Sequence, residues 1–137
     1  MERLRSFADE CFVSFPGQTI LIADNEPAIF DVLGPKLLRA GFQVLSAQDG
    51  AAALLLAKLR LPSLILLDQC MPAMTGIEVS ERLCERPATA EIPVILLTGL
   101  PIQSCVPPNV REIVTKPFQA KAIIETIQEI LAKSAVA

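Results

Sequence analysis

The chain has 137 residues, of which 52% are hydrophobic and 20% are charged, and its formal net charge at pH 7 is -3. This size and balance exclude an intrinsically disordered chain and predict one folded domain. The sequence has no cluster of Lys and Arg, so we expect no direct binding of nucleic acid. No apolar run is long enough to span a membrane, and the start of the chain is too charged for a signal peptide, which predicts a cytoplasmic protein.

Histidine is absent from the sequence, which excludes any metal site or catalytic triad that needs this side chain. Four cysteines are present, but no two of them form a C-x-x-C pair. We therefore interpret them as reduced cysteines and not as a zinc site.

Residues 1–18 precede the repeating pattern and are interpreted as an N-terminal extension. Several apolar residues in it fall at helical spacing, which favours a short helix docked on the domain or on a partner, with a frayed terminus as the alternative. The residues at this spacing are Leu4, Phe7, Ala8, Cys11 and Phe15. We expect the folded domain over residues 19–132 and a C-terminal tail over residues 133–137.

Short apolar segments alternate with helix-like segments from Thr19 onward, a pattern typical of a parallel sheet covered by helices on both faces. Three of these segments are continuously apolar, as strands buried on both faces should be. Two weaker segments fit less buried strands. The five expected strands are Thr19–Ala23, Gln43–Ser46, Leu64–Leu67, Val94–Leu97 and Glu112–Thr115.

The first expected helix runs from Glu26 to Arg39, with Pro27 suited to its first turn. We expect a kink at Pro35, because proline cannot donate a backbone hydrogen bond. The second helix, Ala51–Leu59, is apolar nearly all round. This composition favours a buried helix and leaves a partner-binding face as the alternative.

The third expected helix begins at Thr75, where the sequence has the spacing of a capping box, and ends near Glu85. The last helix, Ala120–Leu131, carries one apolar stripe. Between the fourth and fifth strands, Gly99–Arg111 contains three prolines. A mean helix of about 11–12 residues would use nearly all of this segment, so we expect the fourth connecting helix to be short or absent.

Polar residues follow four of the predicted strands at their carboxyl ends. Asp24 and Asn25 follow the first strand, Asp68 the third, Thr98 the fourth and Lys116 the fifth. These ends meet at one edge of an open parallel sheet, where ligands collect. Two carboxylates and an amide oxygen suit Mg²⁺. A phosphoryl group would bridge such a cation, a hydroxyl and an ammonium.

Each of these residues also has a purely structural alternative. Asp24 and Asn25 would serve as helix caps, Asp68 as the start of a turn, Thr98 as a strand end with a satisfied hydroxyl, and Lys116 as a solvated charge. The joint occurrence at four strand ends favours a functional site.

Four sequence motifs occur in the order found in one known family. They are Ile20-Leu21-Ile22-Ala23-Asp24-Asn25-Glu26-Pro27, Leu64-Ile65-Leu66-Leu67-Asp68 through Met71-Pro72 to Gly76, Pro93 to Thr98, and Lys116-Pro117-Phe118. From Thr19 to about Leu131, the chain resembles the receiver domain of response regulators in two-component signalling. The resemblance implies an α/β fold: a doubly wound, flavodoxin-like sheet of five parallel strands in the order 2-1-3-4-5.

The resemblance also implies a role for each polar residue at the sheet edge. Asp68 matches the aspartate that accepts a phosphoryl group from a histidine kinase or a histidine phosphotransfer protein. Asp24, Asn25 and Asp68, with the backbone carbonyl of Cys70, match the ligands of Mg²⁺. Thr98 matches the switch hydroxyl. Lys116 matches the lysine that contacts the phosphoryl oxygens, and the family has a cis bond between it and the proline at position 117.

By the same resemblance the chain is a regulatory domain rather than an enzyme, it acts on a downstream effector that the sequence does not identify, and a homodimer is left open.

Three features depart from the family pattern. Asn25 replaces a second acid, which predicts weaker Mg²⁺ binding, and Ile113 occupies the switch position where the family often has an aromatic residue. The short, proline-rich segment Gly99–Val110 lies on the face that the family commonly uses for output and dimerisation. We therefore expect phosphorylation to act by ordering this loop.

Two rival functions remain. A pseudo-receiver would keep the fold and bind partners without phosphorylation; Asn25 and Ile113 favour this alternative, whereas Asp68, Thr98 and Lys116 oppose it. A metal-dependent phosphatase with an aspartyl nucleophile is disfavoured, because Asp68-Gln69-Cys70 lacks the second acid that would serve as general acid.

Overall fold

The computed structural model describes residues 17–136, so the helix expected within residues 1–18 falls almost wholly outside the described residues. The described strands are β1 (Thr19–Ala23), β2 (Gln43–Ala47), β3 (Leu64–Asp68), β4 (Val94–Thr98) and β5 (Val110–Thr115). The described helices are α1 (Pro27–Arg39), α2 (Gly50–Arg60), α3 (Gly76–Cys84), α4 (Pro87–Ala90) and α5 (Ala120–Val136).

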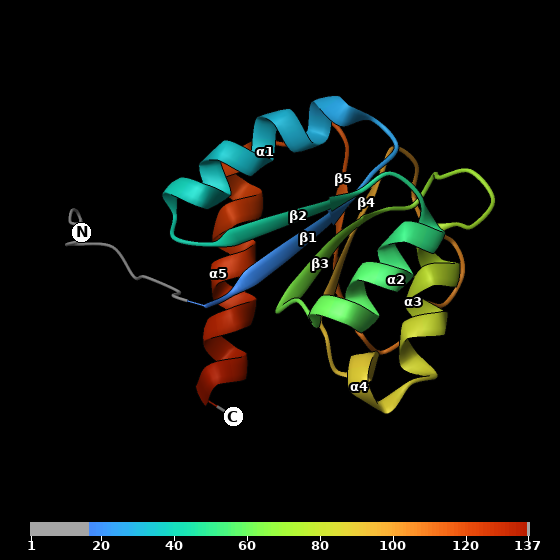
Figure 1. Ribbon diagram of the computed structural model, residues 1–137. Coiled ribbons are helices and arrows are strands. Elements are labelled where there is room, and N and C mark those ends of the chain that lie inside the picture. The colour runs from blue at the N-terminus through green and yellow to red at the C-terminus, as the bar shows by residue number, and fades with distance from the viewer. Residues whose placement is uncertain (1–16, 137) are drawn as a thin grey trace.

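The five strands form one parallel sheet in the order β2-β1-β3-β4-β5. Helices α1 and α5 cover one face of this sheet, and α2, α3 and α4 cover the other (Figure 1). The predicted doubly wound fold and its strand order are therefore confirmed.

Two hydrophobic cores hold these layers together, one on each face of the sheet. Successive residues of a strand point to opposite faces. Ile20 and Ile22 of β1 thus pack under α1 and α5, whereas Leu21 and Ala23 pack under α2 and α3. Every residue of β3 and β4 is buried, which explains why these strands read as continuous apolar runs.

Local signals define where the helices begin. The Thr75 hydroxyl accepts a hydrogen bond from the amide of Glu78, whose carboxylate accepts one from the amide of Thr75, so the predicted capping box is confirmed. The Asp49 carboxylate caps α2 by accepting from the amide of Ala52. Helix α1 begins at Pro27 and continues through Pro35 to Arg39.

One expectation about the helices is confirmed, and two features differ from what was expected. No helix lies between β4 and β5 among the described residues, which confirms that the fourth connecting helix is missing. The short helix α4 was not predicted, and it lies instead between α3 and β4. Helix α5 extends past the predicted end at Leu131, as far as Val136.

The segment that replaces the missing helix is anchored at its far end by Asn109. This side chain is buried, and its amide nitrogen donates to the carbonyl oxygen of Ser80 in α3 at 3.1 Å. The backbone carbonyl of Asn109 accepts from the amide of Val94 at 2.8 Å. Asn109 therefore ties the segment both to α3 and to the start of β4.

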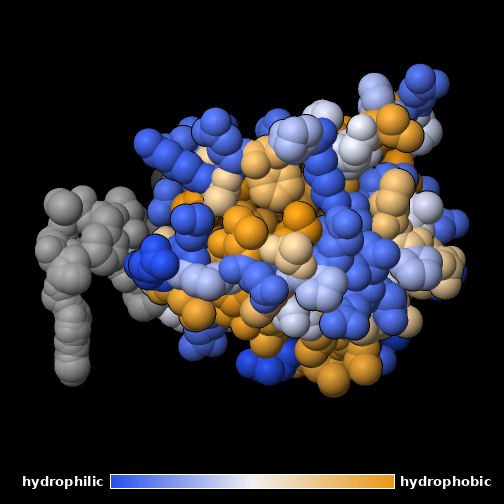
Figure 2. All heavy atoms as spheres, turned by 90° about the horizontal axis from the view of Figure 1, so that it is seen from above, coloured by the Kyte–Doolittle hydropathy of each residue, from blue (hydrophilic) through white to orange (hydrophobic). Residues whose placement is uncertain are grey.

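The interpretation of α2 as a buried helix is wrong. Ala53 and Ala57 are buried, but Leu55 and Leu59 are 57% and 65% exposed. Leu55 and Leu59 therefore leave a hydrophobic surface on this helix, whereas Leu54 and Leu56 are partly buried against the core. Seen from above, the molecule also shows hydrophobic residues among hydrophilic ones (Figure 2). No described helix is both long and apolar enough to cross a lipid bilayer.

Candidate functional site

Lys116 lies between two buried carboxylates at the carboxyl edge of the sheet. Its ammonium Nζ donates to Asp68 Oδ1 at 3.2 Å and to Asp24 Oδ2 at 3.4 Å. The Asp68 and Asp24 side chains are only 5% and 2% exposed, compared with 22% for Lys116. The Glu26 carboxylate adds a longer ion pair to Lys116 at 3.7 Å, but its side chain is 66% exposed. Three of the predicted site residues therefore meet through their side chains.

Strand pairing explains why the two aspartates lie together. β1 and β3 are parallel neighbours, with Ala23 opposite Leu67. The next residues along each strand, Asp24 and Asp68, therefore emerge at the same level of the sheet edge. Asp24 is fixed there because its Oδ1 accepts a hydrogen bond from the amide of Glu26 at 2.8 Å.

Burial and neighbouring charge set the protonation of this group of residues. Burial raises the pKa of Asp68 above its ordinary value, and the nearby charge of Asp24 raises it further, against the opposing effect of Lys116. Burial alone would lower the pKa of Lys116, but Asp24 and Asp68 together outweigh it, so this pKa is raised. Lys116 therefore stays charged, and it only partly offsets the repulsion between the two carboxylates.

Thr98 lies at the same edge, but its hydroxyl is bonded elsewhere. Thr98 Oγ1 donates to the carbonyl oxygen of Leu100 at 2.7 Å and accepts from the amide of Leu100 at 3.2 Å. The carbonyl oxygen of Thr98 accepts from the amide of Lys116 at 2.7 Å, which joins the ends of β4 and β5. The bond between Lys116 and Pro117 is cis, the isomer implied by the resemblance.

The remaining predicted site residues lie at the surface. Asn25 and Cys70 are exposed, and the amide of Cys70 donates to Asp68 Oδ1 at 3.4 Å. Neither Asp24 nor Asn25 caps α1, because the N-cap residue is Glu26 and it makes no side-chain capping bond. Ile113 on β5 is 39% exposed and contributes no aromatic ring.

Gly76 and Gln69 hold the start of α3 against the main chain at Asp68. The sequence did not predict this role for either residue. A Cβ atom on Gly76 would lie 2.7 Å from the main-chain oxygen of Asp68, so only glycine allows α3 to approach β3 this closely. Gln69 accepts from the amide of Gly76 with its main chain and from the amide of Ile77 with its side chain. The glycine at the start of a capped helix was the only signal for this contact.

The chemistry of the two aspartates fits a hard divalent cation. Both carboxylates face the same ammonium, so two negative charges share the one positive charge of Lys116. Among residues 17–136, no cluster of three or more Asp, Glu, Cys or His side chains is arranged to hold a metal ion. A cation here would therefore complete its shell with amide, main-chain and water oxygens, which suits Mg²⁺.

Comparison with known proteins identifies a family. Residues 20–128 match the response regulator receiver domain. The chain is 35% identical over 119 residues to the DNA-binding dual master transcriptional regulator RpaA of a Synechocystis strain. This match covers 84% of the chain and 49% of that regulator, so the chain spans about half the length of its relative.

Solved structures agree with this match. The N-terminal domain of a response regulator receiver protein from Methanoculleus marisnigri is 34% identical at a TM-score of 0.65, covering 83% of this chain and 96% of that one. The receiver domain of a Pseudomonas aeruginosa sensor histidine kinase, solved with magnesium in its active site cleft, has a TM-score of 0.77. That match covers 85% of this chain and 98% of the other, and its 23% identity supports the fold alone. The chain therefore belongs to the response regulator receiver domain family, the regulatory domains of two-component signalling.

Proposed function

We propose that the chain is a phosphorylation-dependent switch in which Asp68 accepts a phosphoryl group from a histidine kinase or a histidine phosphotransfer protein. The observation that carries this proposal is the Lys116 ammonium 3.2 Å from Asp68 Oδ1 and 3.4 Å from Asp24 Oδ2. A lysine held between two buried carboxylates suits a phosphoryl acceptor, because the incoming group brings further negative charge that the ammonium can stabilise.

The transfer forms one bond and breaks one bond. An oxygen of ionised Asp68 attacks phosphorus, and the bond between phosphorus and the imidazole nitrogen of the donor's phosphohistidine breaks, so the electron pair stays on the imidazole. Lys116 contributes a positive charge that stabilises the phosphoryl oxygens, since its Nζ already lies within hydrogen-bonding distance of Asp68.

The proposed Mg²⁺ ligands are Asp24, Asn25, Asp68 and the backbone carbonyl of Cys70. Bound there, Mg²⁺ would neutralise charge on the transferred group. Asp24 is held for this task by the amide of Glu26, and Asp68 by the amide of Cys70. Asn25 contributes a neutral oxygen where a carboxylate would contribute charge, so the cation site is the weak part of this arrangement.

Thr98 is the proposed switch residue. Its hydroxyl must give up the hydrogen bond that it donates to the carbonyl oxygen of Leu100 before it can donate to a phosphoryl group on Asp68. Ile113 has no aromatic ring that could move together with the Thr98 hydroxyl. The movement of Thr98 would therefore alter the conformation of the loop that follows it. We propose that this loop presents the altered surface to a cytoplasmic protein effector. The DNA binding named for the longer relative is not part of this proposal.

The test is incubation with the phosphoryl donor acetyl phosphate, with the gain in mass measured by intact-protein mass spectrometry. In the presence of Mg²⁺, the wild-type chain should gain one phosphoryl mass, and Asp68→Asn should gain none. Asp31→Asn, which removes an exposed carboxylate of α1, is the matched control and should be phosphorylated like the wild type. A chain that stays unmodified with donor and Mg²⁺ in excess would support the pseudo-receiver instead.

A further inference from the structure

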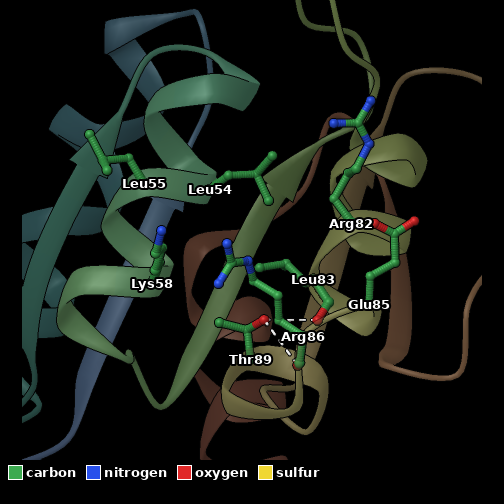
Figure 3. Close-up of a pocket in the computed structure, with 8 residues that line it drawn as sticks. All are labelled: Leu54, Leu55, Lys58, Arg82, Leu83, Glu85, Arg86 and Thr89. Carbon is green, nitrogen blue, oxygen red and sulfur yellow. Dashed lines mark hydrogen bonds between the residues drawn. The ribbon is translucent and has the colours of Figure 1, made fainter.

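A second candidate site lies in the groove between α2 and α3. Its volume is about 380 Å³, and it is lined by Leu54 and Leu55 of α2, by Leu83 of α3 and by Thr89 of α4, with charged residues around them (Figure 3). Volumes of this size are typical of sites that enclose one or two side chains of a partner or a small ligand.

The wall formed by α2 is hydrophobic where a helix exposed to solvent is normally polar. Leu55 lines the groove and is 57% exposed, while the small residues Ala53 and Ala57 face the core. Leu59, one helical turn further along α2 and next to the groove lining, is 65% exposed. Exposed leucines in a row are typical of a surface that another protein covers.

The floor of the groove offers an apolar surface. Leu83 and Thr89 are 2% and 1% exposed. The Thr89 hydroxyl donates to the carbonyl oxygen of Leu83 at 2.8 Å, so its proton is already used within the protein. A ligand would therefore find van der Waals contacts on the floor and polar partners only at the rim.

The rim of the groove is positively charged. Lys58, Arg82 and Arg86 surround it, and Glu85 is the one acid among the lining residues. Figure 3 shows the side chain of Arg86, the N-cap residue of α4, extending toward α2. Among the described residues, none of these three cations forms an ion pair, and Lys116 accounts for the ion pairs that do occur. In a chain of net charge -3, this is a local excess of unpaired positive charge.

We propose that this groove binds a short acidic, leucine-bearing segment of a partner protein. An aliphatic side chain enters between Leu54 and Leu83, and flanking carboxylates pair with Lys58, Arg82 and Arg86. A nucleic acid fits less well, because the exposed leucines offer nothing to a phosphate backbone. The groove is formed by the last turn of α3, whereas Asp68 contacts its first residue, so the two sites are distinct.

The experiment is an NMR titration of the full chain with labelled leucine methyl groups. Two synthetic helical peptides serve as probes, with leucines at the same positions and either glutamates or lysines around them. The glutamate peptide should shift the methyl signals of Leu54, Leu55 and Leu83 and bind at least about tenfold more tightly than the lysine peptide. Its binding should weaken at high salt, because the charged rim is exposed to solvent.

Variants separate this groove from general attraction of an acidic peptide. Arg86→Glu and Leu55→Ser should each weaken binding about tenfold or more. Arg39→Glu makes the same charge change in the last turn of α1 and should leave binding unchanged. Equal binding of both peptides, shifts centred elsewhere, or no shift at millimolar glutamate peptide would each overturn the proposal. Circular dichroism of each variant checks that it is folded.

Discussion

Thr98 and Leu100 are joined by two hydrogen bonds that run in opposite directions. The Thr98 hydroxyl donates to the carbonyl oxygen of Leu100 at 2.7 Å and accepts from the amide of Leu100 at 3.2 Å. The small turn closed in this way begins the connection between β4 and β5. The hydroxyl cannot keep both bonds and also donate to a group on Asp68, because it has a single proton.

The first prediction follows from this competition. When beryllofluoride, a phosphoryl mimic, is bound at Asp68, the Thr98 hydroxyl should donate to the mimic instead of to the carbonyl oxygen of Leu100. If the Thr98 side chain rotates toward the mimic, its oxygen also leaves the amide of Leu100, which should then exchange hydrogen faster. The rest of the Gly99–Val110 loop should become ordered and show the largest protection change, with little change in α5. Thr98→Val, which lacks the hydroxyl, should show fast exchange at Leu100 with and without the mimic. A change centred on α5 or α2 would assign the output to a different surface.

The second prediction concerns the raised pKa of Asp68. Its ordinary pKa is 3.8 and its pKa in the folded chain is higher, so ionisation of Asp68 at neutral pH favours the unfolded chain. Asp68→Asn should therefore raise the free energy of unfolding at pH 7. The gain should shrink as the pH falls through the raised pKa and vanish below pH 3.8.

Urea denaturation at several pH values measures this effect. Asp31→Asn on the exposed surface of α1 is the control and should change stability little at any pH. A loss of stability in Asp68→Asn at pH 7 would mean that the bond to Lys116 outweighs the burial of the carboxylate.

The third prediction concerns the cation site. Asn25→Asp should tighten Mg²⁺ binding roughly several-fold, because a carboxylate replaces a neutral oxygen beside a divalent ion. Calorimetric titration measures the affinity directly. Gln43→Glu adds the same charge at the opposite end of the sheet, where β2 begins, and should have no such effect. Unchanged affinity in Asn25→Asp would show that residue 25 does not approach the metal.

The fourth prediction tests the contact behind Asp68. Gly76→Ala should lower the free energy of unfolding by about 1–3 kcal/mol and slow phosphorylation, because the added methyl group meets the main-chain oxygen of Asp68 at 2.7 Å. Gly99→Ala is the matched control, since a Cβ there has no neighbour within 4 Å. Thermal unfolding and the rate of mass gain give the two readouts. Equal stability of both variants would mean that α3 can shift away at no cost.

The sequence predicted the parts of the fold in which one physical signal dominates. Strands β3 and β4 are buried on both faces, so their apolar runs were unambiguous. The orientation of α2 was not predictable, because a helix that is apolar nearly all round has no pattern to show which side faces the core. Helix α4 was missed because a single turn, Pro87–Ala90, is too short to show helical periodicity.

At the site, strand ends predicted which side chains converge, but not which atoms they bond. Because the carboxyl ends of parallel strands meet at one edge of the sheet, the positions of Asp24, Asp68 and Lys116 after their strands were sufficient to predict that they lie together. The rotamer of Thr98 and the close approach of Gly76 to β3 depend on packing between segments that are distant in the sequence. Distances of this kind are not encoded in spacing along the chain.

The anchoring of Asn109 sets how far a disturbance at Thr98 can travel. The connection from β4 to β5 is tethered at its start, where Thr98 accepts from the amide of Lys116, and at its end, where Asn109 donates to Ser80. A chain held at both ends can change shape only between them. Such a loop would change its shape on the surface while β4 and β5 keep their pairing, so the event at Asp68 would be displayed by the loop and not by a movement of the sheet.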